Sequence, residues 1–233
     1  MSHADHDLKT SLMRLGGPYD QLEDALLRTF RRYARRYTSP VDSVWDWLAV
    51  AQHHGFATRL LDWTYSPYVA THFATADVEH FDVDGVIWCV DYVRSAEHLP
   101  ISLRAILEQE GANVFTAEML NRGATSLEEF DRLSEEDFVA FIEPPSLDDR
   151  IVNQYALFSL MSRATARLDE WLSRNPELFR RVIIPAELKW EVRDKLDQAN
   201  ITERVLMPGL DGLSRWLTRY YMPRDRYQRR DPD

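Results

Sequence analysis

The sequence has one cysteine among 233 residues and no long apolar run. Cys89 cannot form a disulfide within the chain, so the sequence carries no sign of an oxidising compartment. No stretch approaches the roughly 18 consecutive apolar residues that span a bilayer. We therefore expect a cytoplasmic protein without a membrane segment. Because Cys89 lies in the apolar run 85–90, we interpret it as a buried strand residue.

The chain also lacks an excess of positive charge. Its net charge of −10 opposes attraction to the phosphate backbone of nucleic acids and to anionic lipids, so we expect neither as a general partner. A charge run without interleaved exposed aromatic residues is usually a solubilising surface, and we interpret two basic clusters as solvated faces balanced by nearby acids. The clusters are Arg31, Arg32, Arg35 and Arg36, and Arg224, Arg226, Arg229 and Arg230.

Several sequence motifs of known chemistry are absent. Neither G-x-G-x-x-G nor G-x-x-x-x-G-K-[ST] occurs, which disfavours a dinucleotide fold and a P-loop enzyme. The absence of H-E-x-x-H, C-x-x-C and G-x-S-x-G argues against a zinc site and a serine hydrolase. The adjacent His53 and His54 project in different directions from a helix end, so we expect no metal site. No internal repeat is visible, which excludes solenoids and propellers.

The pattern of helices and strands predicts an α/β (α+β) fold, with a mixed central sheet packed by several helices and helix-rich N- and C-terminal parts. The length suits one hydrophobic core, so we expect a single domain over residues 1–222 and a polar tail over 223–233. The continuously apolar run 85–92 predicts a strand that is buried on both faces and central in the sheet. Weaker strands are expected at 59–63, 138–142, 155–160 and 181–184.

Helices are expected where apolar residues recur at three- and four-residue steps. A first helix carries Leu22 to Tyr37 and ends by Pro40, and a second is capped by Asp42 or Ser43 and stops at Gly55. A third begins with Ser66 as its cap and Pro67 at its first position. Further helices are expected at 101–110, 117–122, 166–173, 185–196 and 210–220.

The segment 52–64 contains an unusual density of polar side chains, Gln-His-His-Gly-Phe-Ala-Thr-Arg-Leu-Leu-Asp-Trp-Thr. One interpretation is structural: His53 caps a helix, Arg59 and Asp62 form a local ion pair, and Trp63 anchors the core. The other is a functional site. Arg59 and Asp62 are costly to bury unpaired, so a shared polar pocket would satisfy both.

The same segment resembles the central signature of the FRG domain family. The resemblance rests on Gln52, His53, Gly55, Thr58, Arg59, Leu60, Leu61, Asp62, Trp63, Thr64, Pro67, Ala70, Phe73 and Ala74. It continues through 8–14, 23–33, 154–158 and 183–217. The Phe/Tyr-Arg-Gly motif that names the family is missing, and we expect an upstream strand carrying it to raise the melting temperature.

The resemblance implies two functions. In the first, a polar pocket binds a nucleotide or another polar ligand, with Trp63 or Tyr65 as a stacking face and Arg59 as a fork for phosphate. In the second, the protein resembles an ADP-ribosyltransferase that uses NAD and is weakened by the missing motif. In such an enzyme an arginine binds the pyrophosphate, Thr58 and the Trp63 region pack against the nicotinamide, and Gln154 or Glu143 binds the ribose.

The site residues that follow from this resemblance are His53, Thr58, Arg59, Asp62 and Gln154 for catalysis, and Arg59, Trp63, Thr64 and Tyr65 for cofactor binding. We predict that His53, Thr58, Arg59, Asp62 and Gln154 converge on one cleft, although Gln154 is distant in the sequence.

Overall fold

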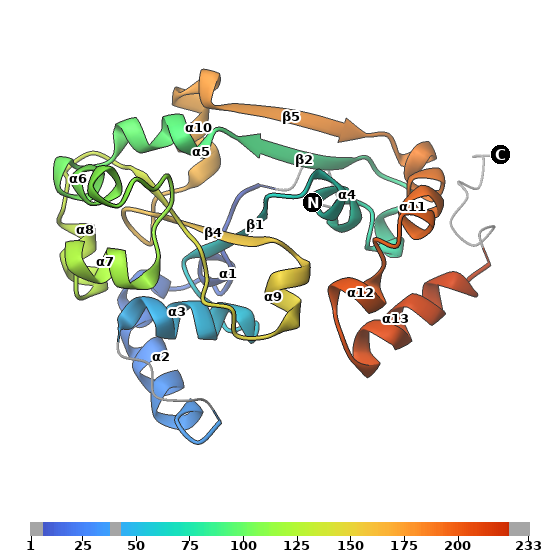
Figure 1. Ribbon diagram of the computed structural model, residues 1–233, viewed down its shortest axis with the longest axis horizontal. Helices are drawn as coiled ribbons and strands as arrows, with labels where there is room; N and C mark the ends of the chain where they lie inside the picture. The colour runs from blue at the N-terminus through green and yellow to red at the C-terminus, as the bar shows by residue number, and fades with distance from the viewer. Residues whose placement is uncertain (1–6, 38–42, 224–233) are drawn as a thin grey trace.

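The computed structural model describes residues 7–37 and 43–223. Two antiparallel sheets lie among the helices, so the α+β class is confirmed. The larger sheet has the order β1 (Leu60–Thr64), β4 (Ala156–Met161) and β3 (Val139–Ile142). The smaller sheet pairs β2 (Gly85–Val90) with β5 (Phe179–Ile184) (Figure 1). Each strand lies where the sequence predicts one.

The expected helices also form, and two of them begin at the predicted caps. Ser43 accepts a hydrogen bond from the backbone N–H of Asp46, and Ser66 accepts one from Val69 with Pro67 at the first helical position. Pro40 and the alternative cap Asp42 lie outside the described residues. The helices are α1 (Ser11–Arg14), α2 (Tyr19–Ala34), α3 (Val44–His53), α4 (Pro67–Ala74), α5 (Tyr92–Ser95), α6 (Ile101–Glu110), α7 (Ala117–Gly123), α8 (Leu127–Asp131), α9 (Asp149–Asn153), α10 (Leu168–Arg174), α11 (Lys189–Gln198), α12 (Glu203–Leu206) and α13 (Leu210–Tyr220).

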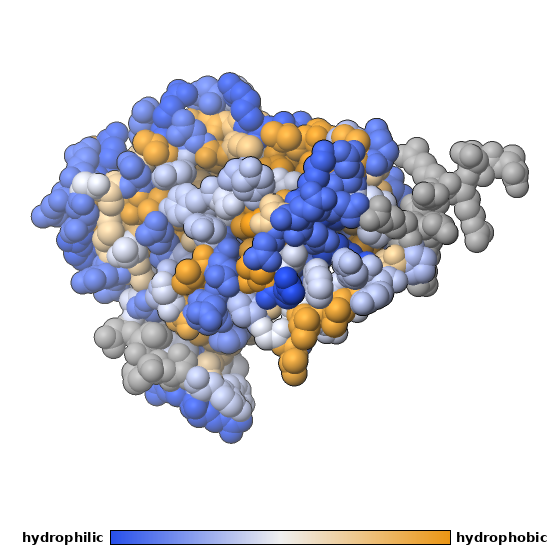
Figure 2. Space-filling view, turned by 45° about the vertical axis from the view of Figure 1, so that its right-hand side comes forward, coloured by the Kyte–Doolittle hydropathy of each residue, from blue (hydrophilic) through white to orange (hydrophobic). Residues whose placement is uncertain are grey.

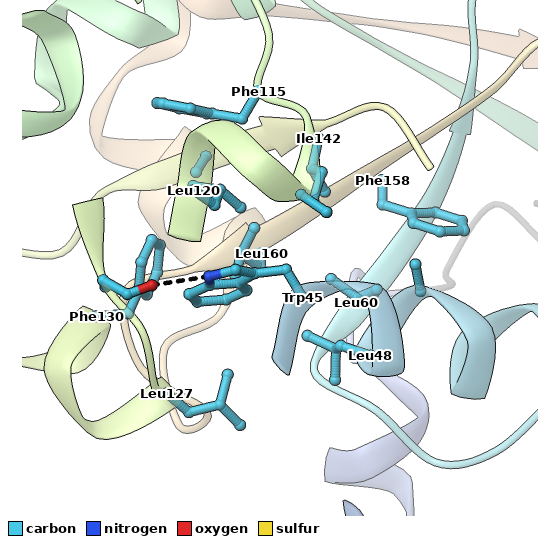
Figure 3. Packing of buried hydrophobic residues seen from close by; sticks show 14 of the residues in the cluster. Trp45, Leu48, Leu60, Phe115, Leu120, Leu127, Phe130, Ile142, Phe158 and Leu160 are labelled. Carbon is cyan, nitrogen blue, oxygen red and sulfur yellow. Dashed lines mark hydrogen bonds between the residues drawn. The ribbon is translucent and has the colours of Figure 1, made fainter. Parts of the chain in front are cut away.

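The main core lies between one face of the larger sheet and helices α3, α6, α7 and α8. Leu60, Phe158 and Leu160 supply the sheet face, and the fully buried Trp45 of α3 packs against Phe130 (Figure 3). The indole N–H of Trp45 donates to the carbonyl oxygen of Ala124 at 2.9 Å, so its one polar atom is satisfied inside the core.

The opposite face of the larger sheet has its own apolar cluster. Leu157 and Met161 alternate with the residues of the main core along β4, and they pack with Phe141 and Trp171. Side chains of a strand point alternately to the two faces, so β4 is buried on both sides. β4 also pairs with β1 on one side and with β3 on the other, so it is the central strand and β1 lies at one edge.

The prediction for the run 85–92 is wrong in two respects. β2 lies in a two-stranded sheet instead of a central mixed one, and Cys89 is exposed. The apolar run is buried at Gly85 and Val86, where α4 packs against it, whereas Trp88 and Val90 are only partly buried against the second apolar cluster. Both sheets are antiparallel, so the expected single mixed sheet is also wrong.

No helix among the described residues is long and apolar enough to cross a membrane. The predicted boundary at residue 222 stays a prediction, and residues 224–233, with the second basic cluster, lie outside the described part of the chain.

Candidate functional site

A cavity of about 320 Å³ follows the free edge of β1. Residues of both faces of β1 line it, because the wall wraps around an edge strand. Helices α3 and α9 lie on one side of the β1 and β4 pair, and α4 and β2 lie on the other (Figure 1). The lining residues are Leu8, Gln52, His53, Leu61, Asp62, Trp63, Thr64, Ala70, Phe73, Ile87, Trp88, Arg150, Ile151, Gln154, Ala156 and Phe158.

A short chain of hydrogen bonds fixes the polar floor of this cavity. The buried hydroxyl of Thr58 donates to the amide oxygen of Gln52, and the amide nitrogen of Gln52 donates to Oδ2 of Asp62 at 3.0 Å. The Thr58 hydroxyl in turn accepts from the backbone N–H of Leu60 at 3.1 Å. Thr58 does not line the cavity, but it orients the amide that holds Asp62.

Asp62 is the carboxylate of the floor. Its side chain is open to the cavity, yet protein atoms enclose it on its other sides, and this desolvation raises its pKa above the ordinary value. The hydrogen bond from Gln52 and the nearby charge of Arg150 oppose the rise without cancelling it. Gln52 is the single hydrogen-bond donor to this carboxylate within residues 7–37 and 43–223. Asp62 therefore retains free acceptor capacity toward the cavity.

His53 lies beside Asp62 at the end of α3. Its Nε2 atom is 2.8 Å from Oδ2 of Asp148, which also caps α9 through the backbone N–H groups of Arg150 and Ile151. Partial burial raises the pKa of Asp148, but the hydrogen bonds from His53 and from these N–H groups outweigh it and hold the pKa below its ordinary value. The carboxylate thus fixes the orientation of the imidazole at the cavity wall.

Gln154 and Thr64 close the floor at the other end. The Gln154 amide nitrogen donates to the carbonyl oxygen of Leu206 at 2.8 Å, and the Thr64 hydroxyl donates to the Gln154 carbonyl oxygen at 2.7 Å. The structure therefore brings His53, Asp62 and Gln154 to one cavity, as three of the five residues that were predicted to converge.

Arg59 does not reach this cavity, so its predicted place there is wrong. Its Nε donates to Glu23 of α2 at 2.8 and 3.0 Å, and its Nη1 donates to Asp131. Desolvation lowers the pKa of Arg59, but these two carboxylates outweigh it and raise the pKa above its ordinary value. The alternative of an ion pair with Asp62 is also wrong, because residues three positions apart on an extended segment point to opposite sides, and Arg59 pairs with Glu23 and Asp131 instead.

Of the two aromatic residues that were predicted as a stacking face, one lines the cavity and the other does not. Trp63 lines the cavity, and its indole N–H donates to the Ser159 hydroxyl at 2.8 Å. Tyr65 is exposed outside the lining, where its hydroxyl donates to Glu143 at 3.0 Å. Trp63 thus offers its ring to the cavity, whereas Tyr65 and Glu143 are hydrogen-bonded to each other.

The sequence analysis missed Arg150, Asp148 and Trp88. Arg150 is the second residue of α9, two positions after the capping Asp148. In the sequence this pattern predicts only the start of a helix. The antiparallel pairing of β1 with β4 brings α9 beside the end of α3, and this contact between distant segments has no local signal. Within the described ranges no carboxylate pairs with the Arg150 side chain, and no group of three or more His, Cys, Asp or Glu residues is placed to hold a metal ion.

A comparison with known protein families gives a match over part of the chain. Residues 1–83 match the FRG domain. This match confirms the recognised resemblance over α1 to α4 and β1, the elements that hold Gln52, His53 and Asp62. The searches of curated proteins and of solved structures found no match. The residues of β2, α9 and β4 that complete the cavity therefore lie beyond the stretch that the FRG domain match covers.

Proposed function

We propose that the cavity beside β1 binds a nucleotide or a ligand of the same chemistry. The observation that carries this proposal is the Asp62 carboxylate, which lines the cavity and has one hydrogen-bond donor among the described residues. Its remaining oxygen lone pairs can accept hydrogen bonds from a ligand that carries hydroxyl or amino donors. Vicinal hydroxyl groups of a ribose are donors of this kind.

Other residues of the cavity wall suit the base and the phosphate of a nucleotide. Trp63, Phe73 and Trp88 supply aromatic surface for a planar base. Arg150 supplies a guanidinium at the cavity wall, suited to bind a phosphate group in a bidentate manner. The role that we assigned to Arg59 thus passes to Arg150. The volume of about 320 Å³ lies at the lower end of ligand cavities, so it suits one nucleoside unit better than a whole dinucleotide.

Calorimetric titration with adenosine, AMP, ADP and NAD tests this proposal. We expect binding by the intact protein, at least a tenfold loss in Asp62→Asn, and a selective loss of phosphate-bearing ligands in Arg150→Ala. Glu187→Gln and Arg94→Ala are matched controls, because both residues are exposed and neither lines the cavity. Absence of binding for every ligand, or equal losses in the control variants, would overturn the proposal.

Asp62 also favours a second candidate, the NAD-dependent ADP-ribosyl transfer that the resemblance implies. The sequence offered only Gln154 or Glu143 to stabilise the cationic ribose of the transition state, and a carboxylate performs this role better than an amide. Release of nicotinamide from NAD, lost in Asp62→Asn and unchanged in Glu187→Gln, would support this chemistry. NAD that binds without nicotinamide release would leave the cavity as a binding site only.

A further inference from the structure

The C-terminal end of α2 carries a dense basic surface. Arg28 and Arg32 lie one turn apart, and Arg35 and Arg36 follow directly after the helix. This end of α2 projects from the body of the molecule (Figure 1). In the space-filling view the same projection is mainly blue and pale blue where it is not covered by grey atoms (Figure 2). Its side chains therefore face solvent.

The arginines of this surface have no acidic partner in the part of the chain that the structure describes. Within the described residues, Arg28, Arg32, Arg35 and Arg36 form no ion pair with a carboxylate, whereas Arg59, for example, has two acidic partners. The interpretation of a solvated face neutralised by nearby acids therefore has no support in the described contacts. Four guanidinium groups without a carboxylate partner among the described residues lie within nine positions, and they produce a local positive field despite the net charge of −10.

Exposed aromatic rings alternate with these arginines. Tyr33 is 66% exposed and Tyr37 is 74% exposed. The guanidinium of Arg32 lies 4.7 Å from the ring centre of Tyr33, and that of Arg36 lies 4.4 Å from the ring centre of Tyr37. The sequence alone did not show that these tyrosines face solvent. An exposed aromatic ring offers a face on which a planar group can stack.

We propose that the α2 arginine–tyrosine surface, defined as Arg28, Arg32, Tyr33, Arg35, Arg36 and Tyr37, binds single-stranded nucleic acid. Single strands offer both phosphates for the guanidinium groups and unstacked bases for the tyrosine rings. A duplex hides its base faces, and an acidic peptide has no planar bases, so neither partner uses both features. The surface is separate from the cavity beside β1, so this proposal and the nucleotide proposal can fail independently.

The test measures the fluorescence anisotropy of a labelled 20-nucleotide oligo(dT) and an oligo(U) of equal length, titrated with the whole protein at several salt concentrations. We expect Arg32→Ala/Arg36→Ala to weaken binding at least tenfold. This variant should also lower the slope of log K against log salt by about 1.4, because each neutralised phosphate of a single strand contributes about 0.7. We expect Tyr33→Leu/Tyr37→Leu to weaken binding at least fivefold without changing that slope.

Arg94→Ala/Arg180→Ala is the matched control. It removes the same charge from two exposed arginines on other elements and should leave binding unchanged. Arg32 lies in the last turn of α2, where its positive charge stabilises the helix through the helix dipole. Circular dichroism must therefore show that the variant retains the helical signal. Absence of binding, an equal loss in the control variant, or equal affinity for polyglutamate would overturn the proposal. Tyrosine variants that bind as tightly as the intact protein would also overturn it, since stacking would then have no role.

Discussion

The Nε2 atom of His53 lies 2.8 Å from Oδ2 of Asp148, although 95 positions separate the two residues. The contact joins the end of α3 to the start of α9 and fixes the imidazole at the wall of the candidate cavity. Asp148 performs two tasks, because it also caps α9. Substitutions can separate them.

Asp148→Ser should keep the helix cap and remove the carboxylate beside His53. We expect it to lower the free energy of unfolding by less than about 1 kcal/mol, because the Asp148 side chain is half exposed. Asp148→Ala removes the cap as well and should cost about 1 kcal/mol more. Urea denaturation of both variants measures the difference, and equal stability of the two would show that the cap contributes nothing.

Asp62→Asn should stabilise the free protein at neutral pH, while it weakens the proposed ligand binding. The pKa of Asp62 is raised in the folded state, so its folded form favours the proton, and its ionisation above that pKa reduces stability. The asparagine oxygen can still accept from Gln52. A higher melting temperature for Asp62→Asn than for Glu187→Gln at pH 7 is the expected result. A lower one would indicate that Asp62 is a structural residue.

Arg59→Met should be among the most damaging single changes near β1. The substitution leaves the carboxylate of Glu23 buried without its cation, because Arg59 and Glu23 are only 4% and 6% exposed. Removal of one partner of a buried pair costs roughly 3–5 kcal/mol. Arg132→Met breaks the exposed pair with Glu128 and should cost less than about 1 kcal/mol. Chemical denaturation compares the two.

The buried His72 should make the protein sensitive to mild acid. Burial and the nearby charge of Arg193, which donates to Nδ1 at 2.8 Å, lower the pKa of His72 from 6.5 to about 4. The contribution of the neutral imidazole is therefore complete above pH 6.5 and declines as the pH falls toward 4. The loss is on the order of 3 kcal/mol, since one pKa unit corresponds to about 1.4 kcal/mol.

Two further charges face this imidazole, Glu203 and Arg219. The carboxyl of Glu203 is partly desolvated, but Arg219 and Arg193 lower its pKa from 4.5 to about 2, so its own contribution is lost only below pH 4.5. Unfolding free energies measured from pH 7 to 4.5 in the Asp62→Asn background, which removes the raised pKa of that carboxyl, should therefore report mainly His72. His72→Asn keeps an acceptor for Arg193 and should flatten the curve in that window; an unchanged slope would refute the assignment.

Gly212 of α13 should not tolerate a side chain. A Cβ atom there would lie 1.9 Å from the carbonyl oxygen of Met207 and 2.6 Å from that of Glu203, which are both backbone atoms of the packed α12 segment. Gly212→Ala should lower the melting temperature and make α13 accessible to protease, at a cost of roughly 1–3 kcal/mol or more. Ser214→Ala, at an exposed position of the same helix, is the control and should have little effect.

The sequence by itself determined the secondary structure well. Apolar spacing and the caps at Ser43 and Ser66 are local signals, so α3 and α4 begin where they were predicted. A strand was likewise expected at 155–160, where β4 forms. The segment 52–64, singled out by its density of polar residues, supplies Gln52, His53 and Asp62 to a common cavity.

Tertiary structure alone decided how the elements pair and which charges meet. The apolar run of β2 indicated a strand but not its partner, and pairing with β5 left Cys89 exposed. Arg59 and Asp62 are close in sequence, yet α2 supplies the partner of the first and the cavity surrounds the second. Such contacts depend on the free energy of packing distant segments together, which no local pattern of residues encodes.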